Sequence, residues 1–253
     1  MRLDVPSDGE GDPVVLLPGF GTDISAFAFQ TGALVERYCV LGVNPRGVGD
    51  SQAPDLERYE VPVAAEDVAA VIPGPAHVIG ASLGAAVALE LALARPDLVR
   101  SLVLITPFVE ASARLAAVAT SWCQVRRDAK PETLARMLLP WLFSESFLAN
   151  EKQRELVARG LVGPLARISA DTLERTALGL QAWSGSRAGD LAKIECPTLV
   201  LVAGGDLLTP DSEALAAALP NARSITVPGA GHALSVEAPD AVNQAIAEHL
   251  GQL

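Results

Sequence analysis

The sequence predicts an α/β protein in which a mostly parallel sheet is covered by helices on both faces. Three observations lead to this fold class. The chain has 253 residues, which suits one large domain. Apolar strand-like runs alternate with helix-like segments toward both ends of the chain, whereas the middle contains helix-like segments alone. The strand-like runs are continuously apolar, which is typical of strands buried on both faces.

The first four predicted strands are short apolar runs, each followed by residues that favour a turn. Val14–Leu17 ends at a Pro-Gly pair, and Tyr38–Val43 ends at an Asn-Pro pair. Ala76–Gly80 ends in glycine, and Leu102–Ile105 is closed by a Thr-Pro pair. Helices are expected over about residues 25–37, 63–71 and 82–95, and a proline ends the third of them.

The alternation stops after the fourth strand and resumes near residue 197. Residues 108–190 contain helix-like segments without a convincing strand, and we expect them to form a cap over the carboxyl edge of the sheet. The expected core domain therefore comprises residues 1–107 and 191–253. Its second part should contain a strand over residues 198–203, a helix over Asp211–Leu219, a strand near Ser224–Val227 and a helix over Pro239–Leu250.

The composition argues against several classes of protein. The chain carries 19 Lys and Arg against 30 Asp and Glu, so its net charge is −11, and it lacks the basic stripe that a nucleic-acid binder needs. Its three cysteines lie far apart, which is unlike a disulfide framework and suits a reducing compartment. A signal-peptide pattern and a long apolar stretch are missing, so we expect a cytoplasmic protein without membrane partners.

The first catalytic candidate is Ser82. It lies in Gly80-Ala81-Ser82-Leu83-Gly84, a G-x-S-x-G pattern between a predicted strand and a predicted helix. A serine on such a sharp turn is exposed at the edge of the sheet, and small neighbours avoid clashes there. The helix N-terminus also brings backbone N–H groups beside the hydroxyl. The alternative interpretation is a helix-capping serine between glycines that only pack closely.

A serine hydroxyl needs a general base, and the chain has three histidines. His77 opens the strand that leads to Ser82, so we expect it at the opposite end of that strand. His249 falls on the predicted last helix, where we expect a surface position. His232 lies in a glycine-rich loop after the last strand, at the edge of the sheet where ligands bind. His232 is therefore the candidate base.

The acid that orients the histidine should follow a strand between Ser82 and His232. Asp206 does so, in the segment L-V-A-G-G-D-L-L-T-P. Asp211 is the competing candidate, but it stands at the start of a predicted helix, where a cap is the more natural role. We therefore favour Asp206.

Acyl transfer also requires N–H donors for the negative oxygen that develops in the transition state. The backbone N–H of Leu83, directly after the serine, is one candidate. The second is the N–H of Phe20, in the loop P-G-F-G-T-D, where glycines on both sides let the backbone approach a ligand. A plain glycine turn is the alternative interpretation of this loop.

These motifs, together with N-P-R-G-V-G-D-S at Asn44–Ser51 and G-A-G-H before residue 233, resemble the α/β-hydrolase superfamily in its lidded esterase and lactonase branch. The resemblance covers nearly the whole chain and includes the 3-oxoadipate enol-lactonases. It implies an α/β-hydrolase fold of six to eight strands, with an abbreviated N-terminal hairpin and a helical cap inserted after the sixth-strand position. It also implies catalysis by a serine without a cofactor or metal, and gives Arg46 a structural role only.

The aromatic residues are concentrated in the predicted cap. Six of the 11 aromatic residues lie there. We expect the substrate pocket to be lined by Trp122, Trp141, Phe143 and Trp183, which would suit an apolar acyl or alcohol group. The alternative is that these rings pack the cap onto the core domain.

The sequence therefore predicts a serine hydrolase that cleaves carboxylic esters or lactones of small, largely apolar substrates through an acyl-enzyme. Other activities on the same scaffold stay open, namely a slow-turnover ligand-sensing protein, a cofactor-free perhydrolase and a C–C bond hydrolase. The physiological substrate and the oligomeric state are also open. A metal site is not expected, because the sequence has no His/Cys cluster with ligand spacing.

Overall fold

The computed structural model describes residues 1–252 and is built around a seven-stranded sheet with the order β1-β3-β2-β4-β5-β6-β7. All neighbouring strands run parallel except β1, which pairs antiparallel with β3. This agrees with the predicted fold class and strand number. The strands are β1 (Ser7–Asp8), β2 (Asp12–Leu17), β3 (Tyr38–Gly42), β4 (Ala76–Ala81), β5 (Val99–Ile105), β6 (Thr198–Ala203) and β7 (Ala222–Val227).

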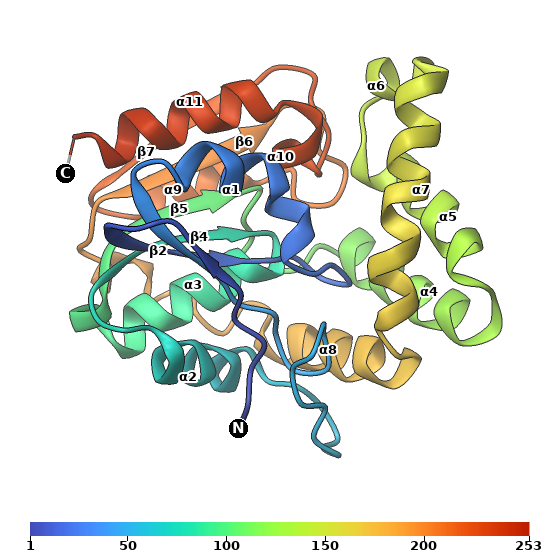
Figure 1. Ribbon diagram of the computed structural model, residues 1–253, viewed down its shortest axis with the longest axis horizontal. Coiled ribbons are helices and arrows are strands. Elements are labelled where there is room, and N and C mark those ends of the chain that lie inside the picture. The colour runs from blue at the N-terminus through green and yellow to red at the C-terminus, as the bar shows by residue number, and fades with distance from the viewer. Residues whose placement is uncertain (253) are drawn as a thin grey trace.

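Helices cover both faces of the sheet (Figure 1). Side chains alternate between the two faces of each strand, so Val14 and Leu16 of β2 join one apolar cluster while Val15 and Leu17 join the other. The first cluster includes α1 and α11, and the second includes α2, α3 and α9. These helices are α1 (Ala28–Leu34), α2 (Val61–Val71), α3 (Leu83–Ala94), α9 (Ser212–Ala218), α10 (Leu234–Glu237) and α11 (Pro239–Leu250).

Five helices are inserted between β5 and β6. Figure 1 shows α4–α7 grouped beside the sheet, with α8 returning toward α2 and α3. None of the helices within residues 1–252 is long and apolar enough to cross a membrane. The inserted helices are α4 (Ala113–Asp128), α5 (Pro131–Leu142), α6 (Glu145–Ala149), α7 (Glu151–Arg167) and α8 (Ala170–Trp183).

The predicted insertion at residues 108–190 encloses these five helices, and the division into a core domain and a cap stays a prediction. Only the two-residue β1 precedes β2, so the insertion follows the fifth strand along this chain. The expected helix over residues 25–37 is divided into a 3₁₀ helix, η1 (Ile24–Phe27), and α1. Phe27 separates the two with φ −105° and ψ 18°, and its ring is fully buried. Two further 3₁₀ turns are η2 (Pro96–Leu98) and η3 (Leu191–Lys193).

His249 is buried, so the expected surface position is wrong. It is only 4% exposed, because it shares a helical face with Val242, Ala245 and Ile246, which α11 packs against the sheet. Burial, together with the neighbouring charge of Arg223, lowers the pKa of His249 to about 4. His77, at the start of β4 as expected, lies 2.8 Å through Nδ1 from Ser101 Oγ, and burial lowers its pKa as well.

The buried, neutral His249 should make the fold sensitive to acid. The pKa of His249 is lower in the folded state than in the unfolded state. Its contribution to the free energy of unfolding is therefore complete above the unfolded pKa of about 6.5 and is lost as the pH falls toward 4. At pH 5 protonation of the unfolded state at this group lowers the free energy of unfolding by about 2 kcal/mol. In urea unfolding at pH 7 and pH 5, His249→Leu should therefore lose less stability between the two pH values than the wild type. An unchanged difference would contradict a buried neutral imidazole.

Candidate active site

Ser82 occupies a tight turn between β4 and α3. Its backbone adopts φ 51° and ψ −114°, a conformation that L-residues rarely adopt. The turn brings backbone segments so close that a Cβ on Gly80 would overlap the carbonyl of Gly84, and a Cβ on Gly84 would overlap the carbonyl of Leu17. The N–H of Ser82 donates to the carbonyl of Ile105 at 2.9 Å. The glycines of the G-x-S-x-G pattern are thus required by close packing.

The structure brings together the three side chains predicted to be catalytic. The Oγ of Ser82 lies 2.9 Å from Nε2 of His232, and Nδ1 of His232 lies 2.7 Å from Oδ2 of Asp206. Each residue lies beyond the carboxyl end of a strand: Ser82 follows β4, Asp206 follows β6 and His232 follows β7. His232 and Asp206 are buried, and Ser82 is partly exposed. This is the geometry in which a histidine can take the hydroxyl proton while a carboxylate holds its other ring nitrogen.

Asp206 is held as a carboxylate by several donors. Its Oδ1 accepts hydrogen bonds from the N–H of Leu208 at 2.7 Å and of Thr209 at 3.1 Å. The hydroxyl of Thr209 donates to Oδ2 at 2.6 Å. Burial by itself would raise the pKa of Asp206, but the hydrogen bond and charge of His232, together with these donors, bring the pKa below its usual value. Asp206 therefore carries its negative charge beside His232 at neutral pH.

Asp211 makes none of these contacts with His232. It stands at the N-cap position of α9, as expected, but its side chain forms no capping hydrogen bond and is exposed. The capping argument was therefore wrong in its detail. The adjacent Ser212 instead donates through Oγ to the carbonyl of Pro107 at 2.7 Å. The two aspartates differ in their contact with His232, which Asp206 alone makes among the residues described. A distance in the folded protein cannot be read from the sequence.

Two threonines near the site were missed in the sequence. Thr209 contacts Asp206 and also lies 3.1 Å through Oγ1 from the carbonyl of Thr106. Thr106 follows β5 with φ 45°, an unusual value for a β-branched residue, and its hydroxyl donates to the carbonyl of His232 at 3.3 Å. The spacing D-x-x-T from Asp206 to Thr209, a local turn pattern, was the available signal for the first. The second had no signal in the sequence.

The loop of Gly19–Thr22 lies against Ser82. A Cβ on Gly19 would stand 3.4 Å from the Cβ of Ser82. The loop turns back on itself, with the hydroxyl of Thr22 donating to the carbonyl of Gly19 at 3.0 Å. Within residues 1–252, neither the N–H of Phe20 nor that of Leu83 donates a hydrogen bond to another protein group. Both predicted donors are therefore unengaged beside the serine.

Ser82 and His232 open onto an apolar cavity of about 350 Å³. Its roof is formed by α7 and the end of α5, and its floor by the loops that follow β2, β4 and β5. Asp23 is the one carboxylate among its lining residues, and it is paired with Arg167. The apolar lining includes Phe20, Leu115, Trp122, Leu142, Phe143, Val157, Leu161, Leu165, Leu180, Leu208 and Val236. The wall of the cavity beside Ser82 is therefore mostly apolar.

Only two of the four aromatic rings predicted to line the pocket do so. Trp122 stacks on Phe20, with ring centroids 6.1 Å apart, and Phe143 lies near the other end of the cavity wall. Trp183 is not among the lining residues, because its indole N–H donates to Glu90 of α3 at 2.5 Å. Trp141 is also absent from the lining and packs against the main apolar cluster. Neither ring lines this cavity, and Trp183 connects the inserted helices to α3.

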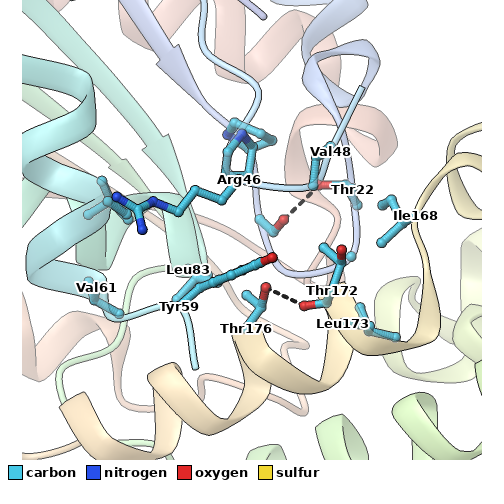
Figure 2. Close-up of a pocket in the computed structure, with 16 residues that line it drawn as sticks. Thr22, Arg46, Val48, Tyr59, Val61, Leu83, Ile168, Thr172, Leu173 and Thr176 are labelled. Atoms are coloured by element: carbon cyan, nitrogen blue, oxygen red, sulfur yellow. Dashed lines mark hydrogen bonds between the residues drawn. The ribbon is translucent and has the colours of Figure 1, made fainter. Parts of the chain in front are cut away.

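A smaller cavity of about 60 Å³ lies on the other side of the loop Gly19–Thr22. Figure 2 shows the side chains of Thr22, Leu83 and Thr172 gathered around it. Gly19, like Thr22, lines both cavities, so this loop is the wall between them. Leu83 lines the smaller cavity and is not among the residues that line the larger one.

The loop around Arg46 is held in place by an ion pair and by hydrogen bonds. Arg46 forms a two-point ion pair with Asp67 of α2, with N–O distances of 2.5 and 3.0 Å. Ser51 accepts a hydrogen bond from the N–H of Asp4 at 2.8 Å and donates to the carbonyl of Asn44 at 2.7 Å. These contacts fix the N-terminal segment beside the sheet. Among residues 1–252, no group of three His, Cys, Asp or Glu side chains is arranged to hold a metal ion.

Known proteins resemble this chain over its whole length. A pimeloyl-[acyl-carrier protein] methyl ester esterase from Chromobacterium violaceum is 33% identical, and the match covers 99% of this chain and 98% of that protein. The structure of a thermophilic esterase from Thermogutta terrifontis, with malate bound, superimposes with a TM-score of 0.86 at 27% identity, covering 99% of this chain and 93% of that one.

The enol-lactonase from Burkholderia xenovorans LB400 gives a TM-score of 0.88 at 24% identity, covering 98% of this chain and 96% of that one, which bears on the fold alone. The sequence profile described as "Alpha/beta hydrolase family" matches residues 14–245. With this match, the seven-stranded sheet and the turn at Ser82, the chain belongs to the α/β-hydrolase family.

Proposed function

We propose that this protein is a serine hydrolase that cleaves carboxylic esters or lactones of small, largely apolar substrates. The observation that carries the proposal is the hydrogen-bonded series Ser82–His232–Asp206, which ends at the apolar cavity. A hydroxyl is a weak nucleophile by itself, and a buried imidazole held by a carboxylate is the arrangement that activates it. The esterases among the similar proteins support the same class of reaction.

In the first half of the reaction, Ser82 Oγ bonds to the substrate's carbonyl carbon while Nε2 of His232 takes the hydroxyl proton. The carbonyl oxygen becomes negative and accepts hydrogen bonds from the N–H groups of Phe20 and Leu83. Asp206 stabilises the imidazolium that has formed. When the bond from carbon to the leaving oxygen breaks, His232 gives its proton to that oxygen, and the acyl group remains on Ser82.

In the second half, water replaces the leaving alcohol. His232 takes a proton from the water as its oxygen bonds to the acyl carbon, and the same two N–H groups bind the second oxyanion. The bond from carbon to Ser82 Oγ then breaks, and His232 returns the proton to the serine. An ester gives an acid and an alcohol, whereas a lactone gives a single hydroxy acid. No cofactor enters either half of this scheme.

Replacing the nucleophile should abolish turnover. We expect Ser82→Ala to lower kcat on short p-nitrophenyl esters by about 10⁴-fold or more, because the acyl-enzyme can no longer form. A fluorophosphonate probe should label the wild type and leave Ser82→Ala unlabelled. Ser235→Ala is a matched control, since Ser235 lines the same cavity without contacting His232. Labelling without turnover on any ester or lactone would favour the ligand-sensing alternative.

The two aspartates should differ in their effect on catalysis. Asp206→Asn removes the charge that stabilises the imidazolium, so we expect kcat to fall by about 10³- to 10⁴-fold. Asp211→Asn is the control, with activity within about twofold of the wild type, because the Asp211 side chain is exposed at α9. Steady-state kinetics on one ester, with the fold checked by circular dichroism, measure both. Equal losses in the two variants would exclude Asp206 as the orienting acid.

A further inference from the structure

The large cavity opens to solvent between α1 and α7. Phe29 of α1 and Leu156 of α7 both line it, yet 53% and 67% of their surfaces are exposed. Gly160 of α7 also lines the cavity and is exposed. Large apolar side chains that remain in contact with water beside an apolar cavity are characteristic of a surface that receives an apolar ligand.

The opposite end of the cavity is closed. Its lining there belongs to the main apolar cluster, in which Trp122, Leu165 and Leu180 are each less than 9% exposed. Ser82 lies on the wall of the same cavity, so a substrate bound at the serine has two directions to occupy. The inner direction is limited by buried side chains, whereas the outer direction leads to the mouth at Phe29 and Leu156.

Helix α7 forms one side of this passage. Its lining residues are Leu156, Val157, Gly160, Leu161, Pro164 and Leu165, which repeat with helical spacing on one face. Nine helical steps span about 13 Å. An extended alkyl chain advances by roughly 1.3 Å per carbon, given a C–C bond of about 1.5 Å, so at most about ten carbons would follow the helix along this length.

Gly160 is the position on α7 at which the passage has no side chain. A Cβ built there meets no atom within 4 Å, so the space beside it is open. Glycine is unfavourable inside a helix, and the chain nevertheless has it at the mouth of the cavity. Gly163, one turn further along α7, also meets no atom, but it does not line the cavity.

We propose that Gly160 keeps the mouth open and sets the chain-length preference of the site. The substrate class is then an ester with an unbranched apolar chain of up to about ten carbons, whose far end passes between Leu156 and Phe29 toward solvent. This proposal rests on the proposed function and extends it. The pairing of Asp23 with Arg167 favours a neutral chain, because no unpaired carboxylate or cation lines the cavity among the residues described.

The test compares Gly160→Leu with Gly163→Leu on p-nitrophenyl acetate and octanoate. In the wild type, kcat/KM should rise about fourfold for each methylene group that the passage buries. Gly160→Leu should lower kcat/KM for the octanoate by about tenfold or more and change the acetate by less than about twofold, since only the longer chain reaches residue 160. Gly163→Leu makes the same helix substitution outside the cavity, so it should leave both substrates unchanged.

Two results with the glycine variants would overturn the proposal. One is an equal loss on both esters in Gly160→Leu, which would indicate a general perturbation of the site. The other is the same selectivity change in Gly163→Leu, which would assign the effect to the helix and not to the passage. A preference of the wild type for acetate over octanoate would also contradict it.

A binding measurement separates this proposal from the proposed function. Binding of p-nitrophenyl octanoate to Ser82→Ala, measured by isothermal titration calorimetry, reports on the passage in a variant that should not hydrolyse the ester. The affinity should fall about tenfold or more when Gly160→Leu is added to Ser82→Ala. If the wild type hydrolyses no ester but this binding difference is found, the proposed function fails and the passage stands. If ester hydrolysis depends on Ser82 but the affinities are equal, the passage fails alone.

Discussion

The site depends on one close approach of backbone, between the turn at Ser82 and the strands beside it. Gly84, at the start of α3, lies against the carbonyl of Leu17 at the end of β2, leaving no room for a side chain. This contact fixes where α3 begins relative to the sheet, and therefore fixes the unusual backbone of Ser82. The N–H of Ser82 is bound in turn by Ile105 of β5. Ser82 is thus positioned by the two neighbouring strands as well as its own.

The other parts of the site follow from the same sheet edge. Because parallel strands end at one side, the loops after β2, β4, β5 and β6 meet there, and each supplies a group to the site. Thr106 and Thr209 connect two of these loops, and Thr106 also binds the backbone of His232. The hydrogen bonds of this network therefore stabilise the negative charge of Asp206 and fix the orientation of its carboxylate.

Strand ends and glycine motifs were sufficient to predict the fold and the positions of Ser82, Asp206 and His232, because these features are local in sequence. The remaining differences depend on packing. His249 continues the helical spacing of Val242 and Ile246. This pattern indicates a buried position, although the side chain is polar. Trp183 carried no sign of its partner Glu90, 93 residues away. Thr106 belongs to none of the predicted catalytic motifs, and its hydrogen bond to His232 depends on how two loops pack together.

The contact of Trp183 with Glu90 connects the inserted helices to α3. With Arg187, it binds the buried carboxylate of Glu90 in the middle of α3, the helix that begins beside Ser82. The end of the inserted segment is thereby anchored to the most deeply packed helix of the protein. The other side of the inserted segment is also held, because the N–H of Ala233 donates to the carbonyl of Leu142 at 2.7 Å and Glu237 accepts a hydrogen bond from the N–H of Ser144 at 3.0 Å. The inserted helices are therefore held at two places, by the helix that begins beside Ser82 and by the segment that carries His232.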